Sequence, residues 1–285
     1  MTSIDGKTAL LGVMGWPVSH TKSPSMQNAA LRAAGLNAAY LPLAVDPAHV
    51  GDAVRGLRAL GFVGCNVTIP HKIAVMPFLD RLTESAELIG AVNTIRVEKD
   101  GSLTGHNTDW QGVTLALAGD GTDLRGKFVA VIGAGGAGRA TLVGCALGGA
   151  AQIAVLNRTL DRAQELVDEF KRRVPGNVSR WEAATLEQGC AWEDVDVVLQ
   201  MSTLGMHGEG VVPVPVDRLP AHCHVLDAVY APLETRFLRE ARERGLKTTD
   251  GLEMLLQQGI AAYEFWLEQK PDRAVMRAAL AVVAK

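Results

Sequence analysis

The sequence predicts an α/β protein with two domains, each built on a mostly parallel sheet covered by helices. Short apolar runs alternate with longer segments that carry helix punctuation, and this alternation occurs once before residue 109 and again after it. Such alternation favours parallel strands, because each crossover needs a connection of helix length. The chain has 285 residues, a length that suits two domains of ordinary size.

Helix start and stop residues define the first series. Ser23 stands at an N-cap position, Pro24 follows in the first turn, and Gly35 ends the helix. The dipeptide Asp46-Pro47 opens a second helix. The expected elements are strands over residues 8–15, 40–45 and 62–69, with helices over residues 24–35 and 46–61.

The second series follows a polar turn at residues 124–127 and begins with a continuous apolar strand. The expected strands cover residues 128–132, 152–156, 195–201 and 224–228. The first expected helix ends at about residue 147, and the others cover residues 161–173, 251–267 and 271–284. We assign the last two helices to the first domain. The first domain then comprises residues 1–108 and 246–285, and the second comprises residues 109–245.

Composition and charge exclude several classes of protein. Hydrophobic residues make up 48% of the chain and charged residues 21%, which is typical of a globular protein. The net charge of −3 gives no basis for binding nucleic acid. No apolar run reaches the roughly 18 residues of a membrane span. The polar N-terminus does not resemble a signal peptide, so we expect a cytoplasmic protein.

The cysteines and histidines do not predict a metal site. The four cysteines are far apart and form no CxxC pair, which favours buried, reduced thiols. The triplet His222-Cys223-His224 could suggest a metal. In an extended segment, however, Cys223 points away from the two histidines. We therefore predict that no metal is bound.

A glycine-rich turn follows the strand at residues 128–132. Gly133, Gly135 and Gly138 fill a G-x-G-x-x-G frame between a strand and a helix. The first glycine permits a tight turn, the second lets backbone N–H groups approach a pyrophosphate, and the third lets helix and strand pack closely. This context predicts a Rossmann-type doubly wound domain. The residues expected at the dinucleotide are Gly133, Ala134, Gly135, Gly136 and Ala137.

The end of the next strand indicates which dinucleotide binds. An NAD site usually carries Asp or Glu there, which accepts a hydrogen bond from the ribose 2′-hydroxyl. Here the strand ends in Asn157, Arg158 and Thr159, and Arg162 follows one turn later. These side chains can face a 2′-phosphate, which favours NADP and leaves NAD as the second candidate. The alternative is that both arginines are solvated surface charges.

Four short motifs outside this domain mix polar side chains with glycine or proline. The first places the hydroxyls of Thr21 and Ser23 at the start of a helix, which suits a small anion such as a carboxylate. The others bring Lys72 and Asp109 to expected element ends, where the active sites of α/β folds lie. The motifs occupy residues 15–24, 66–72, 90–94 and 105–109.

These motifs, in this order, resemble the shikimate dehydrogenase family. The family pattern runs G-x-P-x-x-H-S-x-S-P, N-V-T-x-P-x-K, G-A-V-N-T and N-T-D-x-x-G, then G-A-G-G-A, N-R-T-x-x-R-A, D-x-x-Y-x-P-x-x-T and G-x-x-M-L-x-x-Q. The last four occur here at residues 133–137, 157–163, 227–235 and 251–258. The resemblance implies reversible, NADP-dependent interconversion of 3-dehydroshikimate and shikimate, on the route to chorismate and aromatic amino acids.

The resemblance also implies which residues meet the substrate and the cofactor. Lys72 and Asp109 would form a polar pair at the reacting carbon, and Thr21 and Ser23 would hold the substrate carboxylate. The other implied contacts are Thr68, Asn93, Asp109 and Gln258 at the ring hydroxyls, Tyr230 around the substrate, and Ala228, Gly251 and Glu84 beside the cofactor.

Lys72 is suited to transfer the proton that such a reaction requires. Hydride passes between the nicotinamide and the substrate C3, so the C3 oxygen gains or loses a proton in the same process. A lysine can act as the acid–base group or stabilise the developing alkoxide. His71 is the competing base, but in an extended segment its side chain would point away from Lys72.

Departures from the family pattern leave a second candidate function open. Thr21 replaces a serine, residues 200–206 read Q-M-S-T-L-G-M instead of N-A-T-S-x-G-M, and Gln27 replaces a common histidine. With Gln27, this motif resembles that of quinate/shikimate dehydrogenase relatives, which often use NAD. A quinate/shikimate or aminoshikimate paralogue is therefore the alternative function. A non-catalytic NADP(H) sensor is disfavoured, because Lys72 and Asp109 are both present. The sequence does not distinguish a monomer from a homodimer.

Overall fold

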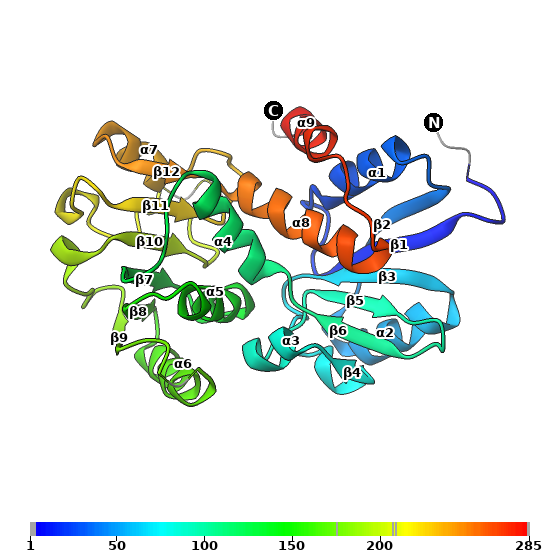
Figure 1. Ribbon diagram of the computed structural model, residues 1–285, viewed down its shortest axis with the longest axis horizontal. Helices are drawn as coiled ribbons and strands as arrows, with labels where there is room; N and C mark the ends of the chain where they lie inside the picture. Colours follow the sequence, from blue (N-terminus) through cyan, green and yellow to red (C-terminus); the bar gives the residue numbers. More distant parts are fainter. Residues whose placement is uncertain (1–3, 175, 207, 209, 284–285) are drawn as a thin grey trace. The chain divides into compact units, whose positions relative to one another are not determined.

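The protein consists of two compact units, each with its own sheet (Figure 1). The computed structural model describes residues 4–174, 176–206, 208 and 210–283. The first unit runs to Thr108 and resumes at Gln258, and the second is Asp109–Gln257. Within the described residues, no helix is both long enough and apolar enough to cross a bilayer.

The first unit is built on a six-stranded sheet with strand order β2-β1-β3-β5-β6-β4. Strand β1 lies between β2 and β3 and is parallel to both, as the alternating pattern predicts. Strands β5 and β6 were not expected and form an antiparallel extension beside β3. The elements are β1 (Ala9–Gly15), α1 (Ser23–Ala33), β2 (Ala38–Ala44), η1 (Pro47–His49), α2 (Val50–Ala59), β3 (Phe62–Val67), η2 (Met76–Phe78), β4 (Arg81–Leu82), α3 (Glu84–Ile89), β5 (Thr94–Val97), β6 (Leu103–His106), the end of α8 (Gly251–Leu267) and α9 (Arg273–Val283).

The C-terminal helices complete this first unit. Helices α1 and α9 lie side by side (Figure 1). The indole Nε1 of Trp266 on α8 donates a hydrogen bond of 2.9 Å to the carbonyl of Ile95 on β5. A Cβ at Gly64 would lie 2.2 Å from that indole nitrogen, so only glycine allows the helix to approach β3 this closely.

The second unit is a doubly wound domain whose six strands are all parallel, in the order β12-β11-β10-β7-β8-β9. Every residue of the central strand β7 is buried, which explains its continuous apolar sequence. The elements are α4 (Asp109–Gly119), β7 (Phe128–Ile132), α5 (Gly136–Leu147), β8 (Gln152–Asn157), α6 (Leu160–Arg173), β9 (Arg180–Thr185), η3 (Trp192–Asp194), β10 (Val197–Gln200), η4 (Val216–Arg218), β11 (His224–Asp227), α7 (Arg236–Glu243), β12 (Lys247–Thr249) and the start of α8.

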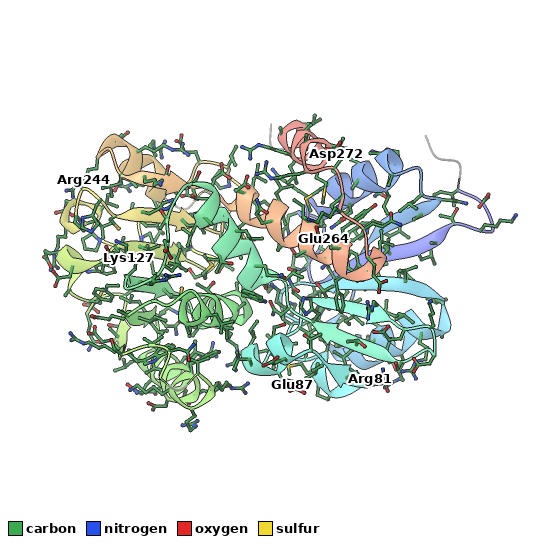
Figure 2. The ribbon with its side chains drawn as sticks, in the orientation of Figure 1. Arg81, Glu87, Lys127, Arg244, Glu264 and Asp272 are labelled. Carbon is green, nitrogen blue, oxygen red and sulfur yellow. The ribbon has the colours of Figure 1, made fainter. Side chains whose placement is uncertain are left out.

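A charged link ties the amino ends of two central strands together. Lys127, labelled in Figure 2, donates from Nζ to Asp196 Oδ1 at 2.9 Å. The other oxygen of Asp196 accepts from the backbone N–H of Phe128, also at 2.9 Å. These bonds align β7 with the segment that enters β10. Ligands of doubly wound sheets bind outside the carboxyl ends of the strands, so we look for the site at the opposite edge.

Two sequence expectations are corrected by the structure. The domain boundary at residue 246 is wrong, because Lys247–Thr249 pairs with β11 as an edge strand of the second sheet. Ser23 is the first residue of α1 rather than its N-cap. Lys22 occupies the cap position, and no side-chain cap hydrogen bond is made there.

Candidate functional site

The glycine-rich turn has a geometric reason for each of its three frame glycines. Gly133 has φ of +107°, and its N–H donates to Leu156 O at 2.8 Å. A Cβ at Gly138 would lie 2.0 Å from the carbonyl oxygen of Gly133, so the helix can approach the turn only without a side chain there. A Cβ at Gly135 would meet nothing within 4 Å. The space above Gly135 is therefore open to a ligand.

This turn fits a dinucleotide. Helix α5 begins at Gly136, with Gly135 as its N-cap and no side chain capping the first turn. The first N–H groups of a helix lack partners within the helix and attract anions. The pyrophosphate of a dinucleotide would satisfy them.

The tip of β8 carries the predicted 2′-phosphate ligands. Asn157 Nδ2 donates to the carbonyl of Thr159 at 3.0 Å and holds the turn that leads into α6. Arg158, Thr159 and Arg162 are exposed. Among the described residues, neither arginine forms an ion pair with a carboxylate. Their charges are thus available to a phosphate.

Two loops flank the glycine-rich turn at the carboxyl ends of β10 and β11. A Cβ at Gly133 would lie 3.1 Å from Met201 C and Ser202 N, so the segment after β10 packs directly on the turn. A Cβ at Gly251 would lie 2.5 Å from Ala228 O. The start of α8 is therefore pressed against the loop after β11. Tyr230 lies in this same loop and is half-buried.

A buried carboxylate orders the loop after β11. Asp227 Oδ1 accepts from the N–H of Val229 at 3.0 Å, and its Oδ2 accepts from the hydroxyl of Thr235 at 2.7 Å. Burial raises the pKa of Asp227 to about 6, although these two hydrogen bonds oppose the shift. Thr235 also caps α7 by accepting from Leu238 N at 3.2 Å. Asp227 thereby fixes both ends of the segment that carries Ala228 and Tyr230.

A buried amide–hydroxyl network lies at the end of β3 in the first unit. Tyr40 OH donates to Asn66 Oδ1 at 2.6 Å, and Asn66 Nδ2 donates to the carbonyl of Asn93 at 3.0 Å. Asn93 Oδ1 accepts from the N–H of Thr108 at 2.8 Å, and its Nδ2 donates to the hydroxyl of Thr108 at 3.0 Å. Asp109 follows Thr108 directly and is buried at the start of α4.

The same network reaches Lys72. The N–H of Val92, which precedes Asn93, donates to the carbonyl of Lys72 at 2.8 Å. The segments that carry Lys72, Asn93 and Thr108 are therefore tied together, and Asp109 is the next residue along the chain. Lys72 is half-buried. Three of the four predicted substrate motifs thus meet at this network.

His71 is held away from this chemistry. Its segment forms a turn, not the extended stretch expected from the sequence. The buried ring contacts the carbonyl of Val45 at 2.7 Å through Nε2. Since a carbonyl only accepts, Nε2 carries the proton and donates. His71 therefore serves the packing of the first unit.

The remaining substrate motif lies beside β1. A Cβ at Gly15 would lie 2.4 Å from the methyl of Thr68, so glycine makes room for the threonine at the end of β3. The hydroxyl of Thr21 accepts from the N–H of Ser23 at 3.4 Å. Within the described residues, the Ser23 hydroxyl has no hydrogen-bond partner. It is thus available to a ligand at the start of α1.

Three protein families match separate parts of this chain. The family described as "Shikimate dehydrogenase substrate binding domain" matches residues 13–95, "Shikimate / quinate 5-dehydrogenase" matches residues 116–198, and "Shikimate 5'-dehydrogenase C-terminal domain" matches residues 251–281. The shikimate dehydrogenase (NADP(+)) of Geobacter sp. (strain M21) is 42% identical over 282 residues, which are 98% of this chain and 97% of the relative. The chain belongs to the shikimate dehydrogenase family.

Solved structures of shikimate dehydrogenases confirm the predicted fold class. A shikimate dehydrogenase in complex with NADP+ is 36% identical, with a TM-score of 0.92, and the match covers 99% of this chain and 98% of that one. The enzyme from Thermus thermophilus, in complex with NADP(H) and shikimate, is 35% identical with a TM-score of 0.86. That match covers 96% of this chain and 99% of the other.

Some residues singled out from the shikimate dehydrogenase pattern have ordinary structural surroundings. Glu84 is exposed at the start of α3, and no described contact ties it to another predicted site residue. Gln27 is buried, and its Nε2 donates to the carbonyl of Gly259 at 2.9 Å. Gln27 therefore fastens α1 to α8. Gln258 is buried on α8 beside this contact.

Residues that this family member needs around its site are only partly predictable from the sequence. Asn66 and Thr108 belong to the motifs, but the motifs alone assign them no role, and Asp227 enters only as part of a pattern. Their burial is the signal that matters, because a buried amide or carboxylate must have partners. Sequence alone does not supply that burial.

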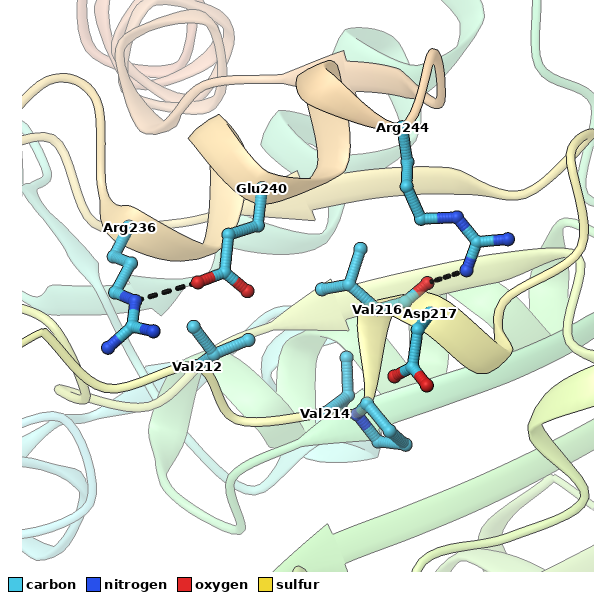
Figure 3. A pocket seen from close by; sticks show the side chains of 8 residues that line it. Val212, Val214, Val216, Asp217, Arg236, Glu240 and Arg244 are labelled. Atoms are coloured by element: carbon cyan, nitrogen blue, oxygen red, sulfur yellow. Dashed lines mark hydrogen bonds and ion pairs between the residues drawn. The ribbon is translucent and has the colours of Figure 1, made fainter.

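A pocket outside the predicted site lies on the second unit (Figure 3). Its volume is 570 Å³, and valine side chains and two arginines line it. Arg236 Nε donates to Glu240 at 2.7 Å, and Arg244 Nη1 donates to the carbonyl of Val216 at 2.6 Å. Both cations are thus engaged within the protein. None of the predicted substrate or cofactor residues lines this pocket.

Proposed function

We propose that this protein is an NADP-dependent shikimate dehydrogenase that interconverts 3-dehydroshikimate and shikimate. The observation that carries the proposal is the buried network that ties the segments of Lys72, Asn93 and Thr108 together. It holds the backbone of Lys72 close to the segment that ends at Thr108, and Asp109 is the next residue along the chain. Relatives of this length carry the name shikimate dehydrogenase (NADP(+)), which supports the assignment.

Polar groups, most of them on the first unit, would hold the substrate. Thr21 and Ser23 would bind the carboxylate, because the Ser23 hydroxyl is available at the start of a helix whose first N–H groups attract anions. Thr68, Asn93, Asp109 and Gln258 would hydrogen-bond the ring hydroxyls, and Tyr230 would help to enclose the ring.

Lys72 would manage the proton in this reaction. The nicotinamide, when bound, supplies or accepts a hydride at the substrate C3. The oxygen on C3 then needs a proton donor in one direction and an acceptor in the other. Lys72 would donate to that oxygen or accept from it, and its charge would stabilise a developing alkoxide. Asp109 would orient the same hydroxyl by accepting its hydrogen bond.

The cofactor would lie on the second unit. Residues 133–137 would bind the pyrophosphate, and Asn157, Arg158, Thr159 and Arg162 would bind the 2′-phosphate. Ala228 and Gly251 would lie beside the nicotinamide, with Glu84 as a further candidate. The open space at Gly135 and the unpaired charges at the tip of β8 support this placement.

A quinate/shikimate dehydrogenase is the second candidate, since one matched family is described for both substrates. The deciding experiment measures kcat/KM for shikimate and for quinate, each with NADP and with NAD. Our proposal expects the shikimate–NADP pair to have the largest value. A larger value for quinate would establish the alternative. Binding of NADPH without turnover of either substrate would establish a sensor.

We also propose a cytoplasmic location and leave a homodimer as a point for sedimentation analysis. All four cysteines are free. Burial is the main cause that raises the pKa of each thiol to about 12. Unpaired cysteines fit a reducing compartment, and buried, protonated thiols are unreactive.

A further inference from the structure

We propose that Gln200 is a positioning residue that controls cofactor affinity through the loop after β10 rather than by touching the cofactor. The inference rests on the dinucleotide site proposed above. Gln200 is the last residue of β10 and is fully buried, with 0% of its surface exposed. A buried carboxamide is costly unless its groups are paired, so its partners show what it does.

The carboxamide of Gln200 is used to close the turn that follows it. Its Oε1 accepts from the N–H of Ser202 at 2.8 Å and from the hydroxyl of Ser202 at 2.8 Å. Its Nε2 donates to the carbonyl of Leu204 at 2.9 Å and to that of Ser202 at 3.3 Å. The Ser202 hydroxyl in turn accepts from the N–H of Leu204 at 3.2 Å. One side chain thus bonds to both Ser202 and Leu204 and closes the turn between them.

That turn is in direct contact with the glycine-rich turn. The N–H of Met201 donates to the carbonyl of Ile132 at 2.8 Å. A Cβ at Gly133 would lie 3.1 Å from both Ser202 N and Ser202 Cβ, so no space separates the two turns. A shift of residues 201–204 would therefore displace Gly133 or open a gap beside it.

Gln200 also stands where the sheet changes winding direction. It pairs in register with Ile132 on one side and with Asp227 on the other. Its carbonyl accepts from the N–H of Ala228 at 2.9 Å. Ligands of doubly wound sheets bind at such a switch point. Gln200 thus connects, through its backbone and its amide, the three loops that border the dinucleotide site.

The direct test replaces Gln200 with methionine, which has similar length but no amide. We expect Gln200→Met to raise the Kd for NADPH, measured by fluorescence titration, by about tenfold, which is 1.4 kcal/mol. The KM for NADP should rise in parallel, while the KM for shikimate stays within about twofold. This pattern follows because the turn borders the cofactor half of the site only.

Gln27→Met is the matched control. Gln27 is also a buried glutamine with an amide donated to a backbone carbonyl, but it lies in the first unit. The Gln27→Met variant should lower the melting temperature about as much as Gln200→Met does, and it should leave the Kd for NADPH within about twofold of the wild-type value. Equal Kd values for the Gln200→Met and wild-type proteins, with a lowered melting temperature, would overturn the proposal.

A milder variant keeps the proposal testable where Gln200→Met does not fold. Ser202→Ala removes one acceptor and one donor of the same turn with little change in volume. It should raise the Kd for NADPH by about threefold, whereas an unchanged Kd would overturn the proposal. Because the titration needs no substrate, it also separates this inference from the proposed function. That function fails instead if the wild-type protein binds NADPH but does not oxidise shikimate.

Discussion

Arg158 provides the sharpest test of the cofactor assignment. It stands on the exposed turn after β8, held by the hydrogen bond from Asn157 Nδ2 to Thr159 O. Among the described residues it has no ion-pair partner, so its replacement removes little of the fold's own bonding. Arg158→Ala should therefore act on the ligand's 2′-phosphate and on nothing else.

The size of the effect follows from the surroundings of Arg158. A hydrogen bond to a charged group contributes about 1.5–3 kcal/mol, and about 1.4 kcal/mol is a factor of ten. The guanidinium is exposed and Arg162 remains one turn away, so solvent screening places the loss at the lower end. We expect kcat/KM with NADP to fall about tenfold. With NAD, which lacks the phosphate, it should change less than about twofold.

The assay compares initial rates of shikimate oxidation with NADP and with NAD for the wild type, Arg158→Ala and Arg172→Ala. Arg172 is the matched control, because it is an exposed arginine at the far end of helix α6, which follows the turn that carries Arg158. Its replacement should leave both cofactors unaffected. An equal loss with NADP and NAD in Arg158→Ala would refute the role of Arg158 at a 2′-phosphate.

Three further predictions concern catalysis, packing and pH. Lys72→Ala should lower kcat by about 10²–10⁴-fold while NADPH affinity by fluorescence stays within about twofold; near-normal turnover would assign the proton to another group. Gly138→Ala places a Cβ 2.0 Å from Gly133 O and should lower both the melting temperature and NADPH affinity, whereas Gly56→Ala, where a Cβ meets nothing within 4 Å, should not. Burial, with a smaller contribution from Lys247, lowers the pKa of His224 to about 4. The unfolded chain therefore binds more protons below pH 6.5, and about 3 kcal/mol of stability is lost as the pH falls from about 6.5 to about 4. In urea unfolding, the free energy of unfolding should fall less over that pH range for His224→Gln than for the wild type. An equal fall in the two proteins would contradict the assignment of this pH dependence to His224.

Strongly patterned elements of this fold could be predicted to the residue. Strand β7 occupies residues 128–132 and helix α8 occupies residues 251–267, as expected. A fully buried strand is apolar throughout, and α8 starts at a glycine that close packing requires. The edge strands β9 and β12 were missed, because their sequences, RWEAAT and KTT, mix in polar residues that are mostly only partly buried, and so lack the apolar run of a central strand.

The candidate site could be predicted from the sequence only where a motif by itself determines the local backbone geometry. The glycine frame does so, since Gly133 has a positive φ and Gly138 lies against the Gly133 carbonyl, while Gly135 leaves open space beside the turn. The roles of Asn66 and Asp227 could not be predicted, because they depend on partners such as Tyr40 and Thr235 that only the folded chain brings near. His71 illustrates the converse, since its segment forms a turn and its ring is used for packing.

The discontinuity of the first unit has a consequence for synthesis on the ribosome. Residues 109–257 are contiguous and can close their core as soon as they emerge. The earlier segment cannot complete its packing by then, because Trp266 and Gly259, which contact Ile95 and Gln27, follow the second unit in the chain. The nascent N-terminal sheet therefore exposes apolar surface for most of translation.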